Sequence, residues 1–174
     1  MKRVLTILGI VAAVLLVASF AFRAFTKLGS PEAVAQTTQN GLTVKVDYCQ
    51  PAKKGRAIFG GLVPYGQVWR TGANEATVIE FEQPATVAGQ PLKAGKYSLW
   101  TIPSQQGWIA VFNGQTGQWG TMYDQEKDVL RVPVSARPHS PTAERFTISF
   151  TPATGGTDMI LAWDQTEAVV PIRQ

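Results

Sequence analysis

The stretch AGKYSLWTIPSQQGWIAVFNG (94–114) decides the class of fold. Two runs rich in aromatic and β-branched residues, 94–103 and 107–114, stand on either side of a short polar segment, which is the pattern of a β-hairpin. The stretch LTVKVDY (42–48) alternates apolar and polar residues, so it predicts a strand with one buried face. TVIEFEQ (77–83) alternates in the same way and stops at a proline. These patterns indicate short antiparallel strands.

Further strands are predicted at similar spacing, separated by Gly, Pro and Asn. They are 86–92, which contains a turn at Gly89-Gln90, and 129–134, 144–150, 157–163 and 167–172. After residue 30 no apolar period of 3.6 residues is long enough for a substantial helix. We therefore predict an all-β domain over residues 41–174, an antiparallel, jelly-roll-like β-sandwich, with a barrel as the alternative.

The N-terminal segment is predicted to be a membrane element. Residues 4–22 contain no charged side chain, and as a helix they would span roughly 28 Å, close to the thickness of a bilayer's hydrocarbon core. We interpret residues 1–29 as a membrane anchor, or alternatively as a cleaved signal, since Ser19-Phe20-Ala21 resembles a cleavage site. Lys2, Arg3 and the α-amine before the segment slightly outweigh Arg23 and Lys27 after it, which favours a domain outside the cytoplasm. Residues 30–40 are expected to be a tether, and the domain is expected in the cell envelope, or secreted after cleavage.

Charge and composition exclude several classes of protein. Four basic residues precede residue 30, and the rest of the chain carries twelve basic and twelve acidic residues, so the net charge of +4 belongs to the N-terminal segment. A domain without excess positive charge is not expected to bind nucleic acid. One cysteine, Cys49, and one histidine, His139, exclude an internal disulfide and a multi-histidine or thiolate metal centre, so no metal or cofactor is expected. His139 lies between prolines and is expected in an exposed loop.

Several separated motifs occur in an order that is similar to a known family. They are GRAIFGG (55–61), FGGLVPYGQVWRTGANEATVIEF (59–81), AGKYSLWTIP (94–103), NGQTGQWG (113–120) and DVLRVPV (128–134). On these motifs the chain, from about residue 42 to residue 172, resembles the bacterial domain of unknown function 2911. The resemblance implies a secreted or envelope β-sandwich domain, and it implies no established substrate, cofactor or catalytic residue. Where such sequences commonly read Asp-Tyr-Ser-Arg-Pro, this chain has Cys49 and Gln50, so any role of that arginine would not transfer.

The segment 65–75 is the strongest candidate for a binding site. It places an aromatic ring, a guanidinium, an amide and a carboxylate among glycines, which are groups able to stack on, clamp and orient a ligand. The predicted ligand-binding residues are Tyr65, Trp69, Arg70, Asn74, Glu75 and Trp119. A structural alternative exists, in which Arg70 pairs with Glu75 and Trp69 belongs to the core.

Two functions remain open from the sequence. The first is a membrane-tethered, non-enzymatic binding or scaffold module for a small polar, glycan or protein partner, with no catalytic residue. The second is a hydrolase acting on an envelope polysaccharide, with Glu75 and either Glu80 or Glu82 as acid and base. Glycoside hydrolysis also needs surroundings that raise one carboxyl pKa, and an alternating strand usually presents such glutamates to water, which favours the binding module.

Overall fold

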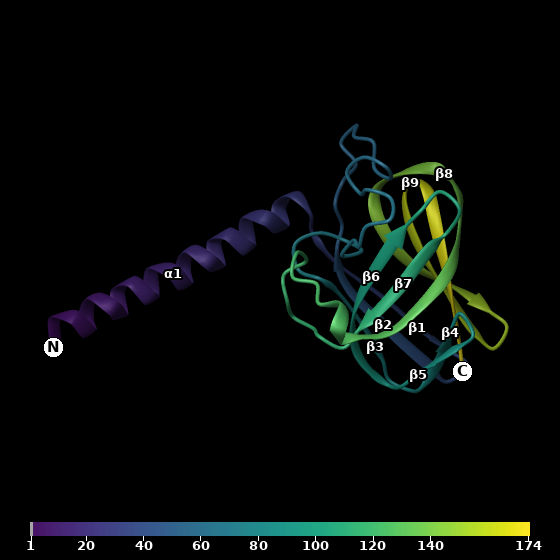
Figure 1. The fold of residues 1–174 in the computed structure, drawn as a ribbon, viewed down its shortest axis with the longest axis horizontal. Helices are drawn as coiled ribbons and strands as arrows, with labels where there is room; N and C mark the ends of the chain where they lie inside the picture. The colour runs from purple at the N-terminus through teal and green to yellow at the C-terminus, as the bar shows by residue number, and fades with distance from the viewer. Residues whose placement is uncertain (1) are drawn as a thin grey trace.

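A computed structural model describes residues 2–174, which form one long helix followed by a β domain (Figure 1). The helix, α1 (Lys2–Gly29), extends away from the domain and is long and apolar enough to cross a membrane. The strands are β1 (Glu32–Gln39), β2 (Leu42–Cys49), β3 (Thr77–Phe81), β4 (Ala85–Val87), β5 (Gln90–Leu92), β6 (Gly95–Pro103), β7 (Trp108–Asn113), β8 (Asp128–Ala153) and β9 (Gly156–Arg173). A short 3-10 helix, Gln125–Lys127, precedes β8. The predicted N-terminal helix and all-β domain are confirmed.

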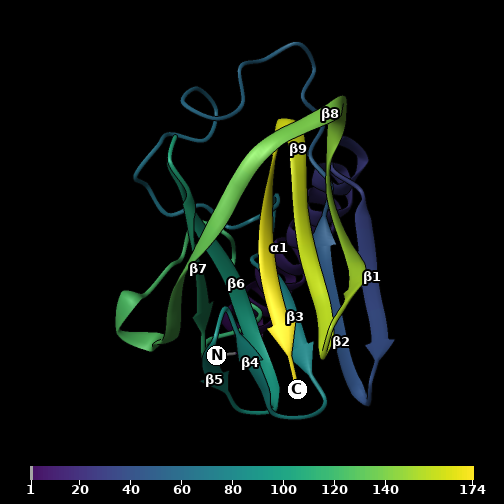
Figure 2. The ribbon, with the colours of Figure 1, turned by 90° about the vertical axis from the view of Figure 1, so that its right-hand side faces the viewer.

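Antiparallel pairing links all nine strands in the order β1-β2-β3-β6-β7-β8-β9-β4-β5. Strand β8 connects the two parts of the molecule, because its first residues pair with β7 and its later residues with β9. In Figure 2, β8 and β9 lie in front of β2 and β3. Side-chain contacts join these layers. For example, the hydroxyl oxygen of Tyr48 on β2 accepts a hydrogen bond from the backbone N–H of Ile148 on β8, with an N to O distance of 3.0 Å. The strands are linked in one sheet, and their division into two separate sheets stays a prediction.

Two segments differ from the sequence-based prediction. Residues 30–40 are not a tether, because β1 pairs with β2 along its full length as the outermost strand. Its sequence, EAVAQTTQ, has few large apolar residues, and an edge strand with mostly exposed or partly exposed side chains needs few. The prolines around His139 do not end a strand either, since β8 continues through them with an irregular register against β9. His139 is partly buried there, and its Nδ1 lies 2.7 Å from a carboxylate oxygen of Glu167.

Aromatic side chains join the loops to the core. The ring of Trp69, in the segment between β2 and β3, stacks on Trp163 of β9 with centroids 5.7 Å apart and an interplanar angle of 20°. Phe146 of β8 meets Trp69 edge-on at 5.0 Å, and Phe59 contacts the same group. Trp69 is only 9% exposed. This packing holds the segment with the predicted site residues against the sheet.

Candidate functional site

The segment 69–76 is fixed at both ends by backbone hydrogen bonds. Trp69 and Thr101 of β6 exchange two such bonds, with N to O distances of 2.8 and 2.9 Å. At the other end the N–H of Ala76 donates to the carbonyl oxygen of Gln118 at 3.1 Å. Because both ends are bonded, the residues between them are held in one conformation rather than moving as a free loop.

Arg70 lies on this segment with its side chain packed over Gly120. A Cβ built on Gly120 would lie 1.9 Å from Cδ of Arg70, so only glycine leaves room for this placement. The Nε–H of Arg70 is buried and finds no acceptor among the described residues, and burial lowers the pKa of the guanidinium. Residues 2–174 contain no ion pair between Arg70 and Glu75. The alternative in which these two side chains pair with each other is therefore not observed.

A cavity of about 290 Å³ lies beside Arg70. The polar and aromatic side chains on its wall are those of Ser30, Arg56, Trp69, Arg70, Asn74 and Trp163. Three of these residues carry a buried donor without a partner, namely Nε of Arg70, Nδ2 of Asn74 and Nε1 of Trp163. Trp163 is 1% exposed, so bulk water does not reach its N–H.

The cavity is lined by hydrogen-bond donors, so a group that binds there would have to supply hydrogen-bond acceptors. A buried donor without a partner costs about 1–3 kcal/mol, and three beside one cavity point to a group that supplies acceptor oxygens. None of the described residues lining the cavity is acidic, whereas two are arginines. A guanidinium with neutral donors beside it suits a carboxylate or a phosphate.

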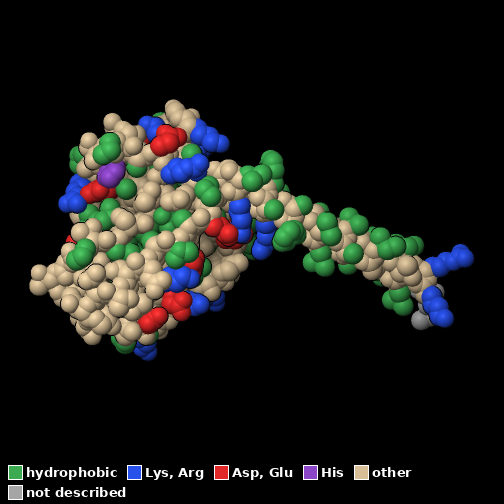
Figure 3. Space-filling view, turned by 180° about the vertical axis from the view of Figure 1, so that it is seen from behind, with side chains coloured by type: hydrophobic (Ala, Val, Ile, Leu, Met, Phe, Trp, Pro, Cys, Tyr) green, Lys and Arg blue, Asp and Glu red, His purple; other side chains and the backbone are tan. Residues whose placement is uncertain are grey.

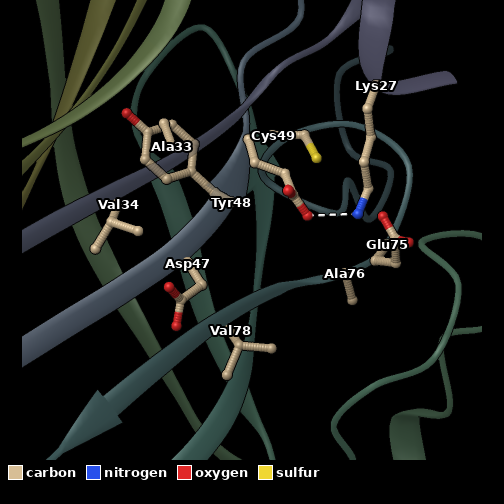
Figure 4. A pocket seen from close by; sticks show the side chains of 10 residues that line it. Lys27, Ala33, Val34, Asp47, Tyr48, Cys49, Glu75, Ala76 and Val78 are labelled. Carbon is tan, nitrogen blue, oxygen red and sulfur yellow. Dashed lines mark hydrogen bonds and ion pairs between the residues drawn. The ribbon is translucent and has the colours of Figure 1, made fainter. Parts of the chain in front are cut away.

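Glu75 points into a different cavity, of about 450 Å³, at the junction between α1 and the domain. Figure 4 shows its carboxylate directed toward the ammonium of Lys27, which is hydrogen-bonded to Glu32. Cys49 and Asp47 of β2 also line this cavity, and burial raises the pKa of the Cys49 thiol. The segment 69–76 therefore separates two environments, one basic and one mostly acidic.

The remaining predicted site residues lie elsewhere. Tyr65, 41% exposed, lines a third cavity of about 200 Å³ together with Ser104 and Arg137. Trp119 forms an isolated β-bridge with Glu75, and its ring faces Phe22 of α1 with centroids 6.1 Å apart. Of the six predicted residues, the structure brings only Trp69, Arg70 and Asn74 to one cavity.

Glu80 and Glu82, the predicted partners of Glu75 in hydrolysis, do not line the cavity that Glu75 faces. Glu80 lies on β3 and pairs with Lys96 of β6 at 3.3 Å, and Glu82 is exposed. Five residues along an extended chain separate the Cα atoms of Glu75 and Glu80 by about 16 Å, whereas paired glycosidase carboxyl groups lie roughly 5–9.5 Å apart. Within residues 2–174 no group of three or more His, Cys, Asp and Glu side chains is placed to hold a metal ion.

Sequence reasoning missed three residues of the basic cavity. Ser30 falls within the predicted tether. Arg56 is held by hydrogen bonds from its guanidinium to the backbone, one of them from Nε to the carbonyl of Lys53 at 2.9 Å. Trp163 continues the inward alternation of Met159 and Leu161 on β9, so it could be predicted as a core residue. No sequence signal shows that its N–H lacks an acceptor, because that depends on the loop packed over it.

The fold and site together define a class of protein: an apolar N-terminal helix followed by an antiparallel all-β domain with a small basic cavity between loops. The chain belongs to the family described as protein of unknown function (DUF2911), whose family model matches residues 30–172. The match begins at the residue that follows α1 and includes β1, in agreement with the strand observed there. Neither the curated proteins nor the solved structures contain a match to this chain.

Proposed function

We propose that this protein is a membrane-anchored, non-enzymatic binding module for a small ligand that carries a carboxylate or phosphate group. The observation that carries the proposal is the set of three unpartnered donors on Arg70, Asn74 and Trp163 around one cavity. An anion in this cavity would accept hydrogen bonds from all three and would offset the charge of Arg70, which is partly buried and has no ion-pair partner among residues 2–174.

The size and walls of the cavity limit the ligand further. A volume of about 290 Å³ holds roughly ten waters at the density of the liquid, so the bound group is small, or is the end of a larger molecule. Leu62, Val63 and the ring of Trp69 form an apolar part of the wall. We therefore infer an acidic group on a compact, partly apolar body, a description that includes an acidic sugar or a chain end with a free carboxylate.

The anchor places this module at a membrane. Hydrophobic side chains cover α1 along its length and two basic side chains lie at its free end, Lys2 and Arg3 (Figure 3). The basic residues before the apolar segment support an orientation with the β domain outside the cytoplasm, in the cell envelope. The cavity includes Ser30, the residue directly after α1, so the ligand would be bound close to the membrane surface.

The experiment is a thermal unfolding series on the full chain in mild detergent. The additives are phosphate, acetate, glucuronate and neutral glucose, the last two forming a matched pair with and without a carboxylate. We expect anions to raise the midpoint of the parent and of Arg145→Met, a control at an exposed arginine, and to leave Arg70→Met unchanged. Equal stabilisation by glucose and glucuronate, or an undiminished anion effect in Arg70→Met, would refute the proposal.

A further inference from the structure

The loop between β7 and the short helix, residues 114–124, runs beside the end of α1 (Figure 1). Its contact with the helix is aromatic, since the ring of Trp119 lies 6.1 Å from that of Phe22, tilted by 40°. Phe22 is the last residue of the uncharged segment 4–22, and Arg23 follows it. The loop therefore meets the helix at the point where its apolar segment ends.

This contact fixes the depth of the loop relative to a bilayer. The segment 4–22 has about the length of the hydrocarbon core, so Phe22 would lie at the boundary of that core when α1 spans the membrane. Trp119 lies within one ring contact of Phe22 and cannot be far from that boundary. Tryptophan is enriched at this level of membrane proteins, because its ring is apolar while its N–H can bond to headgroups or water.

We infer that the loop 114–124 is a membrane-contact surface, with Trp119 inserted among the lipid headgroups of the bilayer that holds α1. Of the five tryptophans, Trp119 is the one with partial exposure, and the other four are at most 9% exposed. Met122, on the same loop, is 62% exposed and adds an apolar side chain to this surface. Arg23 on α1 provides a positive charge for lipid phosphates at the same level.

The loop is part of the rigid domain, so its contact with lipid would orient the whole domain. The N–H of Gly120 donates to the carbonyl of Asn74 at 2.9 Å, and the N–H of Met122 donates to the carbonyl of Trp119 at 2.8 Å. The first of these bonds connects the loop to the segment that carries Arg70, and the second lies within the loop. Trp119 would then hold the basic cavity in a fixed position above the membrane, whatever ligand the cavity takes.

The test is depth-dependent fluorescence quenching of the full chain reconstituted in phosphatidylcholine vesicles. One set of vesicles carries bromine on the acyl chain near the headgroup, and the other carries it near the bilayer centre. We expect quenching of part of the tryptophan emission, greater with the shallow bromines than with the deep ones. This component should be lost in Trp119→Phe and kept in Trp108→Phe, the same change at a residue that is 2% exposed.

Two results would overturn the inference: quenching that is the same in the parent and in Trp119→Phe, including none in either, and quenching that is stronger with deep bromines. Trp119→Tyr guards against misfolding as the cause of a loss, because it keeps an amphipathic ring at the contact but removes the indole signal. This variant should lose the quenched component while keeping the parent's unfolding midpoint. The test uses no ligand of the basic cavity, so its result is independent of the proposed anion binding.

Discussion

Replacing Arg70 by methionine separates a binding role from a structural one. Methionine keeps an unbranched apolar stem over Gly120 and removes a guanidinium whose Nε–H is buried without a partner. Leaving one such donor unpaired costs about 1–3 kcal/mol, so the ligand-free variant should gain about 1 kcal/mol in free energy of unfolding. For a protein of this size that gain raises the unfolding midpoint by about 2–4 °C.

The assay compares thermal unfolding of the parent and Arg70→Met, each with and without a saturating anion. At a hundred times its dissociation constant an anion should add about 2.7 kcal/mol to the parent and nothing to the variant. Without ligand, Arg70→Met would thus be more stable than the parent, and the anion would not change its stability. This is the behaviour expected of a binding site that lowers the stability of the free protein. A ligand-free loss of more than about 1 kcal/mol would refute this reasoning, because it would mean that Arg70 stabilises the fold.

Three further variants test other parts of the account. Gly120→Ala puts a Cβ 1.9 Å from Cδ of Arg70 and 2.7 Å from the carbonyl oxygen of Asn74, so thermal unfolding should show a loss of about 1–3 kcal/mol and titration calorimetry should show loss of anion binding. Trp163→Phe removes one donor while keeping an aromatic ring in the core, and it should weaken anion affinity about tenfold in the same titration. Burial opposes ionisation of Glu167, but hydrogen bonds from Arg137 and His139 outweigh it and keep its pKa below the ordinary value. A carboxylate with a lowered pKa stabilises the fold above its unfolded pKa and ceases to do so as the pH falls through the folded one. The advantage of the parent over Glu167→Gln in urea unfolding should therefore be present at pH 7 and begin to decline as the pH falls below about 4.

The strands with a buried and an exposed face could be predicted from the sequence. LTVKVDY (42–48) alternates clearly and forms most of β2, and the two runs rich in aromatic and β-branched residues within 94–114 form β6 and β7. Strand β1 was missed because an edge strand buries little, so its sequence looks like a polar connection. The length of β8 was missed because prolines normally interrupt a ladder, whereas here the register against β9 shifts around them.

The candidate site could be predicted only in part, since its residues meet through tertiary packing. Local composition pointed to Trp69, Arg70 and Asn74, which share the basic cavity, but also to Glu75, which faces the opposite side of the same segment. Neighbours in sequence diverge here because the chain turns within this segment, where Thr71 and Asn74 have positive φ angles of 51° and 61°. Trp163 enters the cavity from β9, far along the chain, and its contribution follows from the stacking of its ring against Trp69.

The most direct test of anion binding follows the indole N–H signals of the five tryptophans by nitrogen-15 NMR of the full chain in detergent micelles. The signal of Trp163, assigned by its loss in Trp163→Phe, reports on an N–H that has no acceptor in the ligand-free protein. Titration with phosphate or glucuronate should shift this signal to saturation in the parent and leave it in place in Arg70→Met. A Trp163 signal that stays fixed at every anion concentration, or that shifts equally in Arg70→Met, would contradict the account.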